Sequence, residues 1–179
     1  KDWLYLNITA RNDWSSTLPI NKNSFFYPGV TLSWIFSNHL FKDNDILSFG
    51  KLRMAYGQTG SDASPYCTGV NFNQAYVDGY YTDKIVNFPM NGTNAFQTSY
   101  VLGSSSLKPE VTSEFEVGIN SQFFRSRLNM DIAYYHRITN NQIFALPVDP
   151  SSGYTSMVTN FGKVRNQGIE LLLNTTPIQ

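Results

Sequence analysis

The sequence predicts an all-β fold made of antiparallel transmembrane β-barrel strands, in a partial barrel of about six strands. Three observations lead to this prediction. Long segments alternate between apolar and polar residues, the connections between them differ in length, and one connection covers about fifty residues. The smallest barrels of this kind have about eight strands, so we expect residues 1–179 to be one internal segment of a larger barrel domain.

The first predicted strand covers residues 3–13. Its apolar side chains lie at the even positions from Leu4 to Ala10 and alternate with polar ones. At about 3.3 Å per residue and a tilt of about 40°, such a strand rises roughly 28 Å, close to the thickness of the hydrocarbon layer. Trp3 and Trp14 flank it, either as interfacial side chains or as packed core residues.

The second and third strands are predicted over residues 25–36 and 49–59. Pro28 shares the apolar face of the second strand, so a bulge or bend is expected near Pro28-Gly29. Residues 37–48 form a polar connection with one possible helical turn. In the third strand Leu52, Met54 and Tyr56 lie opposite Lys51, Arg53 and Ala55.

A hairpin is predicted over residues 114–137, with Arg125 and Ser126 as its turn residues. Only a two-residue turn brings the apolar sides of both strands onto one face, since a slip of one residue moves every side chain to the other face. This register places Ile119 opposite Ile132, Glu114 opposite Arg137 and Asn120 opposite Asp131. The last predicted strand begins near Asn166.

Both faces together favour a membrane barrel over a soluble sandwich. The strands are longer than the five or six residues usual in sandwiches, and one face is oily while the other carries charges. We therefore expect the following residues to face lipid: Leu4, Leu6, Ile8, Leu32, Trp34, Val117, Ile119, Met130, Ile132, Ile169 and Leu171.

Residues 60–106 and 138–163 are predicted to be long extracellular loops. They are rich in Gly, Ser, Asn and Thr, and a structureless loop of the first one's length is uncommon inside a compact soluble domain. Bacterial barrels place long loops outside the cell and short turns on the periplasmic side. The turn at Arg125 is therefore expected on the periplasmic side.

Composition limits the possible functions. Charged residues are 15% of the chain, aromatic residues 15% and the net charge zero, which gives no reason to expect a nucleic-acid partner. No apolar run reaches about 18 residues, so no transmembrane helix is expected. His39 and His136 are the only histidines and lie far apart in the sequence, so we expect no enzyme, catalytic site, metal site or cofactor.

An ordered set of motifs resembles the SusC/RagA-type TonB-dependent outer-membrane transporters. The two longest are Leu52-Arg53-Met54-Ala55-Tyr56-Gly57-Gln58-Thr59-Gly60 and Asn160-Phe161-Gly162-Lys163-Val164-Arg165-Asn166-Gln167-Gly168-Ile169-Glu170. Between them stand Leu107-Lys108-Pro109-Glu110, Thr112, Glu114, Glu116-Val117-Gly118, Asp131, Tyr134-Tyr135, Gln142-Ile143 and Ser152-Gly153-Tyr154. Their order and spacing match the family across nearly the whole chain.

The resemblance implies a 22-stranded barrel in the outer membrane of a Gram-negative bacterium. It implies import of oligosaccharides or oligopeptides, powered by the TonB complex, beneath a SusD-like surface lipoprotein. The chain departs from the family pattern because it contains no plug domain and no TonB box. The expected partners are therefore outer-membrane lipid, the SusD-like lipoprotein, the substrate and, through other parts of the parent chain, TonB.

Candidate substrate-binding residues fall into two groups. The loop tyrosines, which could stack on sugars or simply pack the loops, are Tyr66, Tyr76, Tyr80, Tyr81, Tyr100 and Tyr154. The charged candidates of the predicted lumen wall are Arg53, Glu114, Glu116, Asp131, Arg137 and Glu170. Paired acid–base catalysis by Glu114 and Glu116 is the less favoured interpretation. The alternative functions are a passive porin or siderophore receptor barrel and, less favoured, a secreted β-sandwich binding module.

Overall fold

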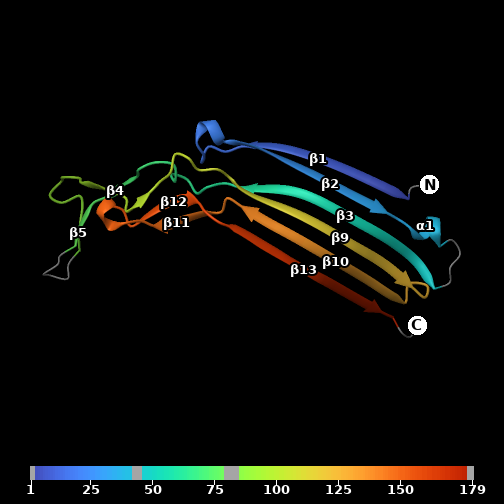
Figure 1. Cartoon of the computed structure of the whole chain (residues 1–179). Coiled ribbons are helices and arrows are strands. Elements are labelled where there is room, and N and C mark those ends of the chain that lie inside the picture. The colour runs from blue at the N-terminus through green and yellow to red at the C-terminus, as the bar shows by residue number, and fades with distance from the viewer. Residues whose placement is uncertain (1–2, 42–45, 79–84, 177–179) are drawn as a thin grey trace.

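Six long strands dominate the computed structural model, which describes residues 3–41, 46–78 and 85–176. They are β1 (Leu4–Trp14), β2 (Ser24–Trp34), β3 (Leu47–Ser61), β9 (Glu110–Phe123), β10 (Leu128–Asn140) and β13 (Lys163–Thr175). They form one sheet in the order β1-β2-β3-β9-β10-β13, with every neighbouring pair antiparallel. The strands lie side by side along one twisted sheet (Figure 1). This arrangement confirms the predicted all-β class.

The register of β9 and β10 agrees with the prediction. Ile119 lies opposite Ile132 and Glu114 lies opposite Arg137. Arg125 and Ser126 have φ angles of 53° and 65°. Positive φ at both central residues is typical of type I′ hairpin turns, whose twist matches that of the strands. The Arg125 N–H also donates to Ser48 Oγ (2.8 Å). Ser48 stands where the register of β3 shifts, between Leu47 and Phe49, so this irregular part of β3 is bonded to the turn.

A bulge or bend was predicted near Pro28-Gly29, and the β1–β2 pairing contains no bulge there. Strand β2 pairs with β1 without a shift from Ser24 to Trp34, and Pro28 lies opposite Ala10. On its other side β2 pairs with β3 only as far as Gly29. Proline has no N–H to donate, so the ladder on one side can continue past it while the ladder on the other side ends.

Each long strand presents one apolar and one polar face to the two sides of the sheet. The registers place all residues predicted to face lipid on the same side, which we call the apolar face. Ile8 is 68% exposed and Ile169 is 75% exposed on this face. A continuous exposed apolar surface of this kind needs an apolar environment, because a soluble monomer rarely leaves one open to water.

Short strands and helical turns occupy the connections. The helical segments are η1 (Ile20–Lys22), α1 (Ser37–Leu40) and η2 (Pro150–Ser152). The short strands are β4 (Phe72–Gln74), β5 (Tyr76–Asp78), β6 (Ile85–Asn87), β7 (Phe96–Thr98), β8 (Val101–Leu102), β11 (Ile143–Pro147) and β12 (Ser156–Asn160). Strands β4, β5, β11 and β12 gather beyond one end of the long sheet, and α1 lies at the other end (Figure 1).

The two predicted loops contain these short strands. Strand β4 pairs with β7, β5 pairs with β6, and β12 lies between β11 and β8, so neither connection is irregular throughout. The long strands also reach further than predicted: β10 continues to Asn140 and β13 already begins at Lys163. The sequence pattern missed β4 to β8 because two or three residues cannot establish a period of two, and β11 and β12, with five residues each, are also shorter than the long strands.

A small hydrophobic core lies where the connections meet the long strands. It consists of Leu18, Phe25, Tyr27, Ala63, Leu107 and Val158, with Cys67 and Ile143 packed against it. Leu107 is fully buried. Asn160 supports the same region, because its side chain bonds to the backbone N–H and C=O of Lys108, each at 2.8 Å, and to the C=O of Asn141. Segments far apart in the sequence are thereby joined.

Candidate functional site

The polar face of the long sheet carries most of the charged side chains of its strands. The registers place the following residues there: Arg11, Asp13, Lys51, Arg53, Glu110, Glu114, Glu116, Asp131, Arg137 and Glu170. All the charged candidates that the sequence indicated therefore lie on one surface. Strand pairing brings them together from β3, β9, β10 and β13.

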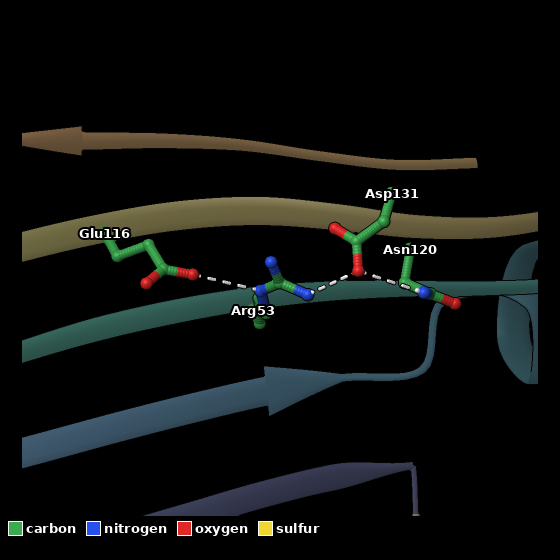
Figure 2. A network of polar contacts seen from close by, with 4 residues as sticks. All are labelled: Arg53, Glu116, Asn120 and Asp131. Carbon is green, nitrogen blue, oxygen red and sulfur yellow. Dashed lines mark hydrogen bonds and ion pairs between the residues drawn. The ribbon is translucent and has the colours of Figure 1, made fainter. Parts of the chain in front are cut away.

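Arg53 is the centre of a polar network that spans three strands (Figure 2). Its Nε lies 3.2 Å from Glu116 Oε1 on β9, and its Nη1 lies 2.8 Å from Asp131 Oδ2 on β10. Asn120 Nδ2 donates to the same oxygen of Asp131 at 3.2 Å. Two carboxylates face one guanidinium, so Arg53 is held from both sides by negatively charged groups.

Gly118 provides the space that this network needs. It lies opposite Arg53 in the β3–β9 pairing, and a Cβ atom there would stand 2.7 Å from Arg53 Nε. The guanidinium therefore lies over a part of β9 that has no side chain. This clearance lets an arginine on β3 reach an aspartate two strands away.

A second ion pair joins β9 and β10 towards the end of the sheet that carries the short strands. Arg137 Nη2 lies 2.6 Å from Glu114 Oε2, and Arg137 Nε donates to the same oxygen at 2.7 Å. The pair borders a hollow of about 230 Å³ that Glu116, Ala133, Tyr135, Asn166 and Glu170 also line. Glu170 brings an additional carboxylate to this hollow.

Small and hydroxyl-bearing residues shape the neighbouring part of the polar face. A hollow of about 310 Å³ is bordered by Glu114 and Glu116 and is otherwise lined by Asn7, Thr9, Gly29, Val30, Thr31, Ala55, Tyr56, Gly57, Thr59 and Thr112. A third, of about 340 Å³, shares Thr9, Gly29, Gly57 and Thr59 with it and extends to Arg11 and Tyr27. The three hollows share lining residues, so we call them together the polar-face groove.

Sequence reasoning did not identify the small residues of this groove. Each looks unremarkable in its own strand, and only the pairing of β1, β2 and β3 sets them beside one another. The sequence feature that could have identified them is their position in the alternation, which places them all on the polar face: Thr9, Thr31, Ala55 and Gly57.

The candidate tyrosines that the structure describes do not join the charged residues. Tyr66 is 80% exposed, and Tyr76 is exposed on β5. Tyr100 and Tyr154 lie in neighbouring segments, because the Thr155 N–H donates to the Tyr100 carbonyl at 2.8 Å. Tyr80 and Tyr81 lie outside the described residues. Tyr66, Tyr76, Tyr100 and Tyr154 thus belong to the short-strand region beyond the sheet, and the charged residues belong to its polar face.

The histidines play no part in a metal centre among the described residues. No group of three His, Cys, Asp or Glu side chains within residues 3–41, 46–78 and 85–176 is placed to hold a metal ion. His39 stacks on Trp3 with ring centroids 5.7 Å apart. In the same part of the chain, no helix is long and apolar enough to cross a membrane.

Comparison with known proteins gives one consistent result. A family model described as "TonB dependent receptor-like, beta-barrel" matches residues 1–176. TonB-dependent receptor P26 of Formosa agariphila is 29% identical over all of this chain and 17% of its own length. TonB-dependent receptor SusC of Bacteroides thetaiotaomicron is 25% identical over 95% of this chain and 17% of its own length.

A solved structure agrees with these relatives. The RagAB peptide importer in its "closed-closed" state superposes with a TM-score of 0.83 and 26% identity, over 99% of this chain and 18% of that chain. The chain therefore spans about 17% of the length of the curated relatives that it matches.

Proposed function

Because the chain belongs to the family of TonB-dependent receptor β-barrels, we propose that its parent protein is an active nutrient importer. Barrels of the SusC and RagA kind lie in the outer membrane of Gram-negative bacteria, and this chain is a segment of one. The proposed cargo is an oligosaccharide or an oligopeptide. The proposed energy source is TonB, which acts through a plug domain encoded elsewhere in the parent protein.

One observation supports this proposal most directly. The family match runs through the whole described sheet, and the same sheet separates an exposed apolar face from a charged, hollowed face. A wall between lipid and a water-filled lumen requires this separation. RagAB, which superposes on the chain, is a peptide importer.

We assign the polar-face groove to the lumen and the tyrosine-bearing short strands to the outer vestibule. Arg53, Glu114, Glu116, Asp131, Arg137 and Glu170 would then meet the cargo or the plug from the wall. Tyr66, Tyr76, Tyr100 and Tyr154 would meet cargo at the entrance. Phenol rings suit both ligand classes, because they stack on apolar faces and their hydroxyls form hydrogen bonds.

The region around β4–β7 and β5–β6 is proposed to dock a SusD-like lipoprotein. Val70, Phe72, Ile85 and Val86 remain exposed there, with Phe72 at 67%. A ribbon of two short strands is marginally stable alone in water, so exposed apolar residues on such ribbons favour a covering partner.

The test is uptake by cells that carry the full-length parent gene, with and without TonB and with and without the neighbouring SusD-like gene. Radiolabelled mixed oligopeptides, oligosaccharides and ferric siderophores are supplied in parallel. We expect uptake of one oligomer class that stops when TonB is deleted. Uptake that is independent of TonB would indicate a porin, and uptake of the iron chelate alone would indicate a siderophore receptor; either result would overturn the proposal.

A further inference from the structure

The two long connections of the sheet are joined to each other, although they are far apart in the sequence. The first runs from β3 to β9 and includes β8, and the second runs from β10 to β13 and contains β11 and β12. Strand β12 pairs antiparallel with β11 of its own connection and parallel with β8 of the other. Figure 1 shows β11 and β12 at the end of the long sheet where β13 begins. The two connections therefore share one small sheet.

Asn160, the last residue of β12, joins the two connections through its side chain. Its Oδ1 accepts the Lys108 N–H, and its Nδ2 donates to the C=O groups of Lys108 and Asn141, each at 2.8 Å. One amide side chain thus bonds to both backbone groups of a residue in the first connection and to one carbonyl in the second. An aspartate has no N–H to donate, so these three bonds require an amide.

Two further contacts hold the same segments together. Glu110 Oε1 accepts the Ile143 N–H at 2.7 Å, so the start of β9 is bonded to the start of β11. Leu107 is fully buried in the small core that also contains Val158 of β12, and Ile143 packs against that core. We call these contacts, together with those of Asn160, the Asn160 junction. Polar bonds and apolar packing both fix one connection to the other there.

The rest of the first connection lies outside this junction. Among the described strands, β4 pairs only with β7 and β5 pairs only with β6. The Ser104 N–H donates to the Cys67 C=O at 2.9 Å, and Cys67 packs against the small core, so the two ribbons are attached beside the junction through this residue. The shared sheet of β8, β12 and β11 is therefore the part of the two connections that the Asn160 junction holds directly.

This shared sheet carries one candidate tyrosine from each connection. Tyr100 directly precedes β8 and is 52% exposed, and Tyr154 lies two residues before β12. The Tyr100 C=O accepts the Thr155 N–H at 2.8 Å and the Thr155 hydroxyl at 3.1 Å. The backbone segments that carry the two rings are therefore bonded to each other. Tyr76, by contrast, stands on the separate β5–β6 ribbon.

We propose that Asn160 is a positioning residue for cargo binding. It holds the two connections as one body, so that Tyr100 and Tyr154 meet the same cargo molecule. The amide of Asn160 is itself engaged by backbone groups, so it acts through the two tyrosines. The inference rests on the proposed function, in which the parent protein imports an oligopeptide or an oligosaccharide past these tyrosines.

Fixing the two tyrosines before the cargo arrives makes binding less costly. If the connections moved independently, only a fraction of the molecules would present both rings together, and the apparent Kd would rise by the reciprocal of that fraction. Loss of the Asn160 amide should therefore weaken cargo binding. It should not change how fast bound cargo is moved, because the proposed energy-driven step acts through a plug domain elsewhere in the parent protein.

The first test measures the junction in the full-length parent protein, by hydrogen exchange resolved to single amides. N160A and N160D are compared with the wild type and with N12A, whose side chain bonds to Ser24 of its own hairpin. We expect the amides of Ile143 and Thr155, neither of which bonds to Asn160, to exchange about tenfold faster in N160A. N160D should exchange at least as fast as N160A, and N12A should match the wild type at both amides.

The second test measures uptake by cells that carry the same variants, with rates normalised to the amount of assembled barrel. We expect N160A to raise the half-saturation concentration about fivefold and to leave the maximal rate unchanged. Y100A/Y154A should also raise the half-saturation concentration. Adding N160A to Y100A/Y154A should raise it no further, because residues that act as one unit are not additive. Exchange at Thr155 should still increase in that triple variant.

Several results would overturn the proposal. Unchanged exchange at Thr155 in N160A, or wild-type exchange in N160D, would show that the amide does not join the connections. An unchanged half-saturation concentration in Y100A/Y154A, an equal effect of N160A with and without the tyrosines, or a fall in the maximal rate alone would show that Asn160 does not act through them. Exchange is measured whether or not the cells import cargo, so a wrong junction and a wrong transport function give different results.

Discussion

Ile132 and Asn129 are close in sequence on β10 but belong to opposite faces of the sheet. Arginine in place of Ile132 would face hydrocarbon, which costs about 2–4 kcal/mol near the middle of a bilayer, whereas arginine in place of Asn129 would face water and cost much less. We expect I132R to assemble poorly in the full-length parent and N129R to assemble normally. Heat-modifiable gel mobility and urea unfolding in detergent measure both. Equal assembly of the two variants would show that the faces are assigned wrongly.

Asp149 gives a pH-dependent prediction outside the membrane-spanning strands. Its Oδ1 accepts a hydrogen bond from the Ser151 N–H at 2.8 Å and so caps η2. Hydrogen bonding from Ser151 lowers the pKa of the Asp149 carboxyl. Because the pKa is lower in the folded state, the cap contributes stability above the ordinary aspartate pKa of about 3.9 and loses it as the pH falls through the folded value.

We therefore expect the Ser151 amide to be protected from hydrogen exchange near neutral pH and to lose protection, beyond the intrinsic pH effect, in strong acid. Exchange of the full-length protein measured by mass spectrometry tests this. The matched control is D149N, which keeps an acceptor oxygen but does not titrate. A protection factor that changes with pH to the same extent in D149N would contradict the assignment to this carboxyl.

At the scale of the elements, Arg53 on β3 reaches Asp131 on β10 across β9, because Gly118 of β9 has no side chain in the way. In G118A the new methyl group displaces the guanidinium from its present position, at little steric cost because a flexible side chain can move. We expect the coupling between Arg53 and Asp131, about 0.2–1 kcal/mol for a partly exposed pair, to disappear in this background. Double-mutant cycles with R53M and D131N, in the presence and absence of G118A, measure it.

A matched control for this cycle is available on β9 and β10. The Glu114–Arg137 pair does not cross Gly118, so its coupling is expected to survive G118A. Loss of both couplings would mean that the alanine disturbs the sheet as a whole. If the Arg53–Asp131 coupling survives in G118A, the network does not need the space that Gly118 leaves.

For the whole molecule, the connection between β3 and β9 provides the functional test. Deleting residues 76–96 from the parent protein removes β5, β6 and the exposed apolar residues Ile85 and Val86, but none of the six long strands. We expect the barrel to assemble while uptake or co-purification of the SusD-like lipoprotein is lost. The smaller variant F72S/F96S removes two exposed rings and should weaken partner binding without shortening the chain. Undiminished uptake with the partner still bound would refute this role.

The alternation of residues by itself determined several features of this protein. It determined the long strands, their two faces and the register of the β9–β10 hairpin, including the opposition of Glu114 and Arg137. A period of two is a local property, and a tight turn allows only one register that superposes two apolar faces. The ordered motifs determined the family, and the match to the TonB-dependent receptor β-barrels confirms it.

Tertiary structure decided which strands are neighbours when long connections separate them. Only the pairing of β3 with β9 brings Arg53 to Glu116 and Asp131, and only the meeting of distant connections buries Leu107. The sequence pattern identified Arg53, Glu116 and Asp131 as candidates but could not show that they meet, and it gave no sign that Leu107 is buried. Contacts between residues far apart in the chain depend on which strands become neighbours in the folded sheet. Strand alternation shows which way a side chain points; what it meets there depends on the neighbouring strand.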